Sequence, residues 1–223
     1  MQLASPPATL PAKPQTIFAE HFTGNDLGSA WEVINRNPDN YIVEGGNLLI
    51  VARTPGGFGN DKAANIFRLT KPMPDGNWGV TVRFAVEFQT LRESLFVGLM
   101  DDAQNYLAAQ LYSRSVCCDT DLILRIVKVS GGQTTEFTQS LPPTKSAAQP
   151  LALRLRKDGH EFRAGISFAG QPDKDGNPVW IETGSVTSLR PPKSFALNAS
   201  QWEQTTGESP FRISAVTIEA PGR

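Results

Sequence analysis

Strict alternation of apolar and polar residues is the feature that most limits the folds open to this chain. The segment Gly79–Gln89 reads GVTVRFAVEFQ, in which every second residue is a valine or a phenylalanine. A period of two places the apolar side chains on one face of a β-strand. Leu151–Lys157 and Glu161–Ala169 show the same period and are separated by Asp158-Gly159, a dipeptide typical of hairpin turns. These three segments are therefore predicted to be strands.

Short apolar segments of similar composition follow one another along most of the chain. Further strands are predicted at Tyr41–Val43, Asn47–Arg53, Ala64–Leu69, Leu95–Met100, Tyr106–Ser113, Asp121–Val129, Gln133–Phe137, Trp180–Val186, Ser194–Ala199 and Arg212–Glu219. No stretch of ten or more residues shows the 3.6-residue period of an amphipathic helix. The 19 glycines and 17 prolines of the 223-residue chain supply the turns that many short strands need. The pattern predicts an all-β fold, either a sandwich or a barrel.

Composition and charge exclude several functional classes. Hydrophobic residues make up 39% of the chain and charged residues 19%, which is typical of a globular protein with a core. The net charge of −1 gives no field that would attract a nucleic acid or an anionic membrane. No apolar run approaches the roughly 20 residues that span a bilayer. We therefore expect no nucleic-acid partner and no membrane span.

The first sixteen residues differ from the rest. They read MQLASPPATLPAKPQT, rich in proline and alanine and without periodicity. We predict a flexible tail or linker over 1–16 and a single domain over 17–223, a length that all-β sandwiches reach. The tail lacks the basic start and apolar middle of a secretion signal. It fits either a mature secreted or periplasmic protein or a domain that follows a proline-rich linker in a longer chain.

Several short sequence motifs, in a fixed order along the chain, carry a resemblance to a known family. They are Phe18–Phe22 (FAEHF) with Leu27 and Trp31, Arg36–Tyr41 (RNPDNY), Glu44–Ile50 (EGGNLLI), Phe96–Tyr106 (FVGLMDDAQNY), Leu153–Gly159 (LRLRKDG) with Phe162 and Ser167, and Val179–Ile181. Together they resemble the C-terminal domain of bacterial β-xylosidases, within the concanavalin A-like lectin/glucanase superfamily. The resemblance implies a two-sheet antiparallel β-sandwich, a jelly roll, and carbohydrate as the ligand class. It does not imply one activity, because this sandwich carries lectins, glycosidases, lyases and accessory modules.

The resemblance also bears on calcium. The chain has Glu20 and His21 where relatives carry two acids, and Ser214 and Ala215 where they often carry an aspartate. Calcium prefers six to eight oxygen ligands, with carboxylates prominent. The acids left as candidate ligands are Glu20 and Glu219. A structural calcium is therefore an open possibility, and no other cofactor is expected.

Catalytic carboxylates are not evident. Sandwich hydrolases of the laminarinase type carry a Glu-x-Asp-x-x-Glu motif, which this sequence does not contain. Hydrolysis of a glycoside needs two carboxyl groups about 5–10 Å apart. The remaining candidate acids are Glu87, Glu93, Asp101, Asp102, Asp119, Asp121 and Glu136. Asp101 and Asp102 lie in a predicted hairpin turn, where aspartate is common because it bonds its own backbone. We predict no catalytic residue.

Two adjacent cysteines, Cys117 and Cys118, are open to two interpretations. They could form a strained vicinal disulfide beside a ligand site, or remain two free thiols on either side of a strand. The sequence favours free thiols, because strain has an energetic cost.

One predicted strand has the composition of a sugar-binding face. In Asn105–Arg114, alternation sends Leu107, Ala109 and Leu111 to the core and sends Tyr106, Gln110, Tyr112 and Arg114 to the other face. Aromatic rings stack on the C–H patches of a pyranose, while amide and guanidinium groups bond its hydroxyls. Trp202 is predicted to join this set. The alternative is that the two tyrosines cover a solvated face or pack under a loop.

The remaining aromatic residues have other expected places. Arg36, Asn40 and Tyr41 form a second, weaker candidate cluster, and Trp31 and Trp180 are interpreted as core or rim packing.

Three functions stay open at this point. The favoured one is a noncatalytic carbohydrate-binding or accessory module, a monomer acting outside the cytoplasm on an oligosaccharide or polysaccharide. The second is a glycoside hydrolase or polysaccharide lyase, and the third is a structural or protein-interaction sandwich whose binding face is filled by loops.

Overall fold

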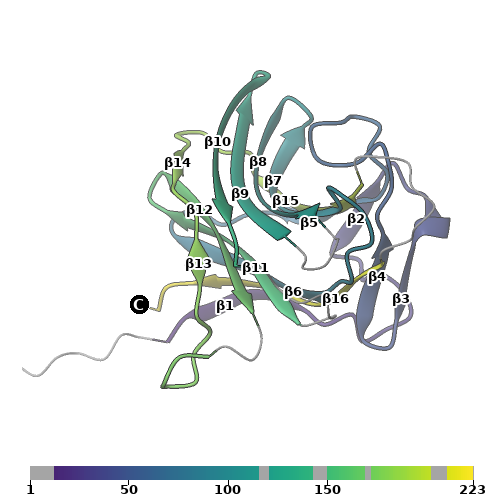
Figure 1. Cartoon of the computed structure of the whole chain (residues 1–223), viewed down its shortest axis with the longest axis horizontal. Helices are drawn as coiled ribbons and strands as arrows, with labels where there is room; N and C mark the ends of the chain where they lie inside the picture. The colour runs from purple at the N-terminus through teal and green to yellow at the C-terminus, as the bar shows by residue number, and fades with distance from the viewer. Residues whose placement is uncertain (1–12, 116–120, 143–149, 169–171, 202–209, 223) are drawn as a thin grey trace, which may run out of the picture.

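The computed structural model describes residues 13–115, 121–142, 150–168, 172–201 and 210–222. These residues fold into two antiparallel sheets that lie one on the other, as Figure 1 shows. The only helix among them is the short 3-10 helix η1 (Pro38–Asn40). The predicted fold class, a two-sheet antiparallel β-sandwich, is confirmed. No helix in the described ranges is long and apolar enough to cross a membrane.

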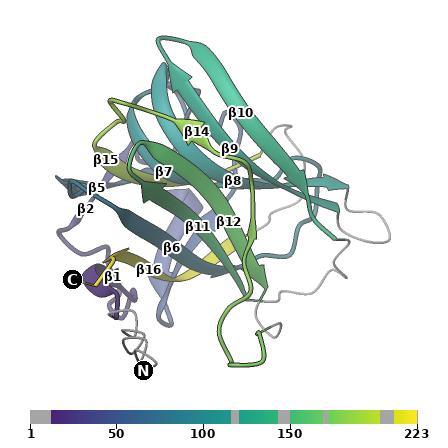
Figure 2. The ribbon, with the colours of Figure 1, turned by 90° about the vertical axis from the view of Figure 1, so that its left-hand side faces the viewer.

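The first sheet, sheet A, has the strand order β13-β12-β11-β6-β16-β4-β3, with β1 paired to β16 and β14 paired to β12. Its strands are β1 (Gln15–Glu20), β3 (Tyr41–Glu44), β4 (Asn47–Val51), β6 (Trp78–Ala85), β11 (Leu151–Asp158), β12 (Glu161–Phe168), β13 (Ile181–Glu182), β14 (Val186–Thr187) and β16 (Pro210–Ala220). Figure 2 shows the β11–β12 hairpin beside β6 and β16.

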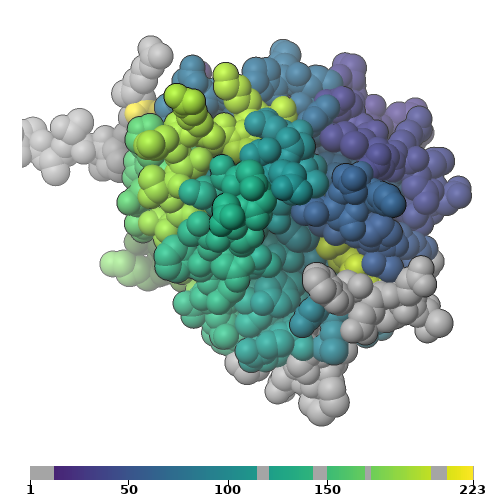
Figure 3. Space-filling model, turned by 90° about the horizontal axis from the view of Figure 1, so that it is seen from above, coloured from purple at the N-terminus to yellow at the C-terminus, as the bar shows by residue number. Residues whose placement is uncertain are grey.

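The second sheet, sheet B, has the strand order β10-β9-β8-β7-β15-β5-β2. Its strands are β2 (Trp31–Ile34), β5 (Ile66–Pro72), β7 (Ser94–Asp102), β8 (Asn105–Ser115), β9 (Asp121–Ser130), β10 (Gln133–Ser140) and β15 (Ser194–Ser200). Seen from above in Figure 3, teal residues from the middle of the chain lie between blue and purple residues from its first part and yellow-green residues from its last part. Parts far apart in sequence therefore share one surface.

The main core lies between the inner faces of the two sheets. Val82 and Phe84 of β6 enter it from sheet A, and Leu107 and Leu111 of β8 enter it from sheet B. Burial of each such side chain stabilises the fold by about 1.5–3 kcal/mol. Trp31 is also buried and packs against other aromatic rings, which confirms its predicted role.

A second, smaller apolar cluster lies on the outer face of sheet B. Residues 52–65, here called the covering loop, run between β4 and β5 and place Phe58 on Phe96 and Tyr106. Phe58 is fully buried although it comes from a loop. Asn198 of β15 anchors the loop, because its Oδ1 accepts from the Gly57 N–H at 2.8 Å and its Nδ2 donates to the Ala64 carbonyl at 2.9 Å.

Some strands differ from the predicted ones. The single strand predicted over Trp180–Val186 is wrong: the chain forms two short strands, β13 and β14, separated by residues 183–185. The Thr183 N–H still donates to the Ala164 carbonyl, but the Ala164 N–H donates to the Thr183 hydroxyl at 3.2 Å instead of to a backbone carbonyl, and the ladder ends there. β1 and β2 were not predicted, because their short sequences show no clear period of two.

Candidate functional site

The side chains of β8 divide between the two faces of sheet B as the alternation predicts. Leu107, Ala109 and Leu111 lie in the main core, whereas Tyr106 lies in the outer cluster. Tyr106 is only 9% exposed. Burial under the covering loop raises the pKa of its phenol, since it disfavours the charged form. Phe58 therefore occupies the place where a sugar would have to stack on Tyr106.

The other predicted binding residues of β8 are largely engaged by the protein itself. Gln110 is buried, and its side-chain oxygen accepts from Arg125 at 3.3 Å, while Arg125 also pairs with Glu136. Arg114, beside a register irregularity, pairs with Asp121. The structure thus does not gather these side chains into an open site.

Tyr112 is half-buried on the strand that pairs with β7 and β9. Trp202 lies outside the described residues, as do Cys117 and Cys118, so their predicted roles stay predictions.

The two candidate calcium ligands lie apart. The β1–β16 register sets Glu20 opposite Val216 and Thr16 opposite Glu219, so Glu20 and Glu219 are separated by about 10 Å along the strands. Glu20 instead accepts from the backbone N–H groups of His21 (3.0 Å) and Phe22 (2.9 Å). Within the described ranges, no three His, Cys, Asp or Glu side chains gather as a metal would require.

The acids of the β7–β8 turn have a local structural role. Asp102 accepts from the Gln104 N–H at 2.7 Å and from the Asn105 amide at 3.0 Å. The Asn105 bond, then the Gln104 bond, holds the pKa of Asp102 below its usual range. This is the turn geometry that the sequence predicts.

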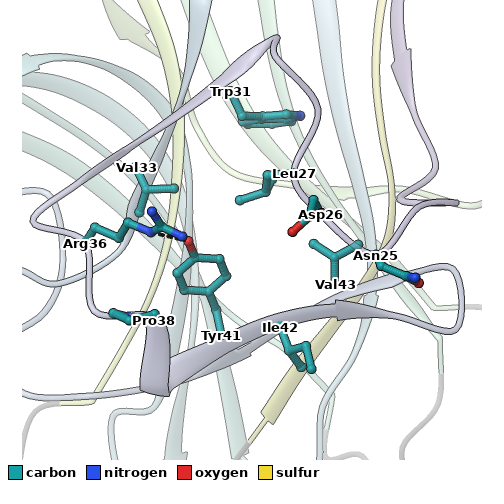
Figure 4. A pocket seen from close by; sticks show the side chains of 10 residues that line it. All are labelled: Asn25, Asp26, Leu27, Trp31, Val33, Arg36, Pro38, Tyr41, Ile42 and Val43. Carbon is teal, nitrogen blue, oxygen red and sulfur yellow. Dashed lines mark hydrogen bonds between the residues drawn. The ribbon is translucent and has the colours of Figure 1, made fainter.

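An open pocket lies at one edge of the sandwich, between β2 of sheet B and β3 of sheet A (Figure 4). We call it the edge pocket. Its volume is about 380 Å³, within the range of about 300–1,000 Å³ typical of small-molecule sites. Its lining residues are Asn25, Asp26, Leu27, Trp31, Val33, Arg36, Pro38, Tyr41, Ile42 and Val43.

The edge pocket has an apolar floor, to which Leu27, Trp31 and Val43 contribute, and a polar rim. On the rim, Arg36 Nε donates to the Tyr41 hydroxyl at 2.9 Å, which holds the guanidinium beside the ring (Figure 4). The other two nitrogens of the Arg36 guanidinium have no partner among the described residues.

Across the pocket, the Asp26 side chain points inward, as Figure 4 shows. The side chains of Asn25 and Asp26 form no hydrogen bond within the described part of the chain. The rim therefore combines free donors and a free acceptor around an apolar floor.

Part of this site follows from the second cluster proposed from the sequence. Arg36 and Tyr41 line the pocket, whereas Asn40 is buried outside it and accepts from Arg53 Nε at 3.0 Å. Asn25 and Asp26 were missed, because a polar pair in a turn-rich loop carries no periodic signal and its position depends on the fold.

Solved structures of similar fold include two Bacillus proteins. A mutant of the GH43 protein BlXynB from Bacillus licheniformis has a TM-score of 0.69 at 13% identity, over 91% of this chain and 39% of that chain. A xylan β-1,4-xylosidase from Bacillus halodurans C-125 has a TM-score of 0.67 at 12% identity, over 98% of this chain and 41% of that chain. This chain thus spans about two fifths of the length of either protein.

A third structure corresponds to this chain over nearly its whole length. The CBM2 module of the evolved Dit of Lactobacillus casei BL23 phage J-1 has a TM-score of 0.62 at 12% identity, over 96% of this chain and 99% of that module. The sequence matches no protein-family model and no curated protein. At these identities the likeness shows the fold alone, a two-sheet antiparallel β-sandwich that this chain shares with parts of the two Bacillus proteins and with the phage module.

Proposed function

We propose that this chain is a noncatalytic carbohydrate-binding sandwich module that holds a neutral sugar unit in the edge pocket. The observation that carries the proposal is the pairing of an apolar floor with unpaired polar groups on the rim. A pyranose has the matching surface, with C–H patches on its faces and hydroxyls around its edge. Asp26 and Arg36 carry opposite charges, which favours an uncharged, hydroxyl-rich ligand over an ionic one.

The single carboxyl group among the lining residues of the pocket supports binding rather than catalysis. Asp26 is the only one of the ten lining residues with a carboxyl group. A glycosidase would need a second carboxyl about 5–10 Å away across the sugar. The likeness in fold to a CBM2 module of nearly the same length supports the same interpretation. A module for polysaccharides would work where they are found, so we place it outside the cytoplasm.

The test is affinity gel electrophoresis and a glycan array with the folded protein. Asp26→Ala removes a charged acceptor from the rim and should weaken binding about tenfold or more. Asp39→Ala is the matched control, because Asp39 is an exposed acid nearby that does not line the pocket. Tyr112→Ala, on the outer face of sheet B, should leave binding unchanged. The assays are repeated with a chelator, which weakens binding only if calcium shapes the site.

Two results would refute the proposal: no binding to any glycan by the folded protein, or equal losses in Asp26→Ala and Asp39→Ala. Loss of binding in Tyr112→Ala alone would move the site to sheet B.

A structural or protein-interaction sandwich is the second candidate. It is favoured by the covering loop, which fills part of the outer face of sheet B with Phe58. A folded protein that binds no glycan would support this function.

A further inference from the structure

A second depression crosses the outer face of sheet A, on the opposite side of the sandwich from the covering loop. We call it the arginine groove, after Arg83 of β6 and Arg154 and Arg156 of β11, which line it together with Trp180. Its volume is about 590 Å³. None of these four side chains belongs to the edge pocket.

Trp180 forms one wall of the arginine groove. The Arg154 guanidinium carbon lies 3.9 Å from the centroid of the Trp180 ring, a cation–π contact. Gly165 of β12 lies beneath the ring, because a Cβ there would lie 3.2 Å from Trp180 Cε3. The absence of a side chain at Gly165 therefore lets the indole lie close to the sheet beside the arginines.

The arginines retain unused hydrogen-bonding capacity. Arg83 is exposed, and its side chain has no hydrogen bond or ion pair within the described residues. Arg154 donates to Glu182 at 2.7 Å, but its Nε is buried without a partner. Arg156 lies 3.9 Å from the same Glu182 oxygen, and its side chain is 42% exposed. The Glu182 carboxylate thus lies near the guanidinium groups of both Arg154 and Arg156, whereas the Arg83 guanidinium has no ion pair within the described residues.

The charge of the groove differs from that of the chain. Its lining includes four cationic side chains, Arg83, Arg154, Arg156 and Lys157, against the two acids Asp158 and Glu219. Glu182 offsets one further positive charge through its pair with Arg154. The groove keeps a positive excess in a protein with a net charge of −1.

The groove is also elongated. A smaller neighbouring depression of about 280 Å³ adjoins the arginine groove and shares Arg83, Pro178 and Trp180 with it. The two together follow β11 (Leu151–Asp158), a strand about 23 Å long at roughly 3.3 Å per residue. This shape suits a linear chain rather than a single small molecule.

We propose that the arginine groove binds an acidic polysaccharide whose sugar units carry carboxylate groups. Arginine guanidinium groups pair with carboxylates in a planar, two-bond geometry. Arg83 and Arg156 supply these contacts, and Trp180 stacks on the face of a pyranose ring. The site is separate from the edge pocket, so the chain binds a neutral sugar at one place and an acidic polymer at another.

The experiment compares polygalacturonate with its fully methyl-esterified form, which has the same backbone without the charge. Binding is measured by affinity electrophoresis and calorimetry, with chelator present because carboxylates also bind calcium. The wild-type protein should bind the acid form and not the ester, and binding should weaken as salt is raised. Arg83→Gln should lower the affinity about tenfold, and Trp180→Ala should also lower it.

Arg212→Gln is the matched control, because Arg212 is an exposed arginine of β16 that does not line either depression. It should retain wild-type affinity, as should Asp26→Ala, whereas Arg83→Gln should leave neutral-glycan binding intact. Because Asp26→Ala and Arg83→Gln are each tested against both the acidic polymer and the neutral glycan, a failure of this inference can be told apart from a failure of the proposed function. Equal binding of acid and ester, or equal effects of Arg83→Gln and Arg212→Gln, would overturn the inference. Tighter binding of a single-stranded oligonucleotide than of polygalacturonate would also overturn it, by assigning the groove to phosphate.

Discussion

The ring of Phe58 meets the ring of Tyr106 edge to face, with centroids 6.0 Å apart and planes at 86°. Phe58 comes from the covering loop and Tyr106 from β8, so the contact joins a loop to the outer face of sheet B. Such aromatic pairs stabilise a folded protein by more than the burial of their surface area alone would provide. This contact turns a face that could have bound a ligand into a small second core.

Phe58→Ala should destabilise the protein by about 3–5 kcal/mol, because it empties a fully buried site. Chemical denaturation gives the change in free energy of unfolding. Leu189→Ala is the control, since Leu189 is 74% exposed and its truncation should change stability by no more than about 0.5 kcal/mol. Similar changes in the two variants would show that the covering loop does not seal this face.

Tyr106 should make stability sensitive to alkaline pH. Burial raises the pKa of its phenol, so the protonated form is favoured in the folded protein. Its contribution is fully present below the unfolded pKa of about 10 and is lost as pH rises through the folded value. An ultraviolet titration of the protein's tyrosines should show one component that ionises at a higher pH than a free phenol. Tyr106→Phe should remove that component and Phe58→Ala should shift it to lower pH; its persistence in Tyr106→Phe would refute the assignment.

Asn198→Ala should loosen the covering loop. The substitution removes the acceptor of the Gly57 N–H, in a buried bond, and the donor to the Ala64 carbonyl, in a part-buried one. Each buried polar group left unpaired costs about 1–3 kcal/mol. Hydrogen exchange should speed up at the Gly57 amide more than at amides in the centre of sheet A. Uniform acceleration across the protein would instead indicate a global loss of stability.

Gly165→Ala should disturb the arginine groove without disrupting the core. The new Cβ would lie 3.2 Å from Trp180 Cε3 and 3.7 Å from Arg154 Nε, so the indole must move by a few tenths of an ångström. We expect a loss of about 1 kcal/mol in stability and a shift of the Trp180 indole resonance. Gly79→Ala is the control, because its nearest contact would be Arg154 Cδ at an ordinary 3.9 Å. An unmoved indole resonance in Gly165→Ala would contradict this packing.

The alternation in the sequence predicts an all-β fold and the face to which the side chains of several strands point. In β6, β8 and the β11–β12 hairpin, the period of two directs each side chain to one face, and burial follows from that periodicity. The turn at Asp102 follows from local chemistry, because the carboxylate bonds the backbone two residues on. The division into the short strands β13 and β14 could not be predicted, since it depends on a bond from the Ala164 N–H of β12 to the Thr183 hydroxyl.

The candidate site follows from the sequence only in part. Arg36 and Tyr41 stand close together in the chain, so their proximity can be inferred from the sequence alone. Asn25 and Asp26 join them only because two edge strands from different sheets lie side by side.

What the sequence by itself determined is the strand pattern, because alternation is a local property that every short segment carries. The tertiary structure alone decided which polar faces stay open. Phe58 closes one face over Tyr106, whereas Gly165 leaves room for Trp180 on another. The physical reason is that access to a face depends on contacts between residues far apart in sequence, which no local period records.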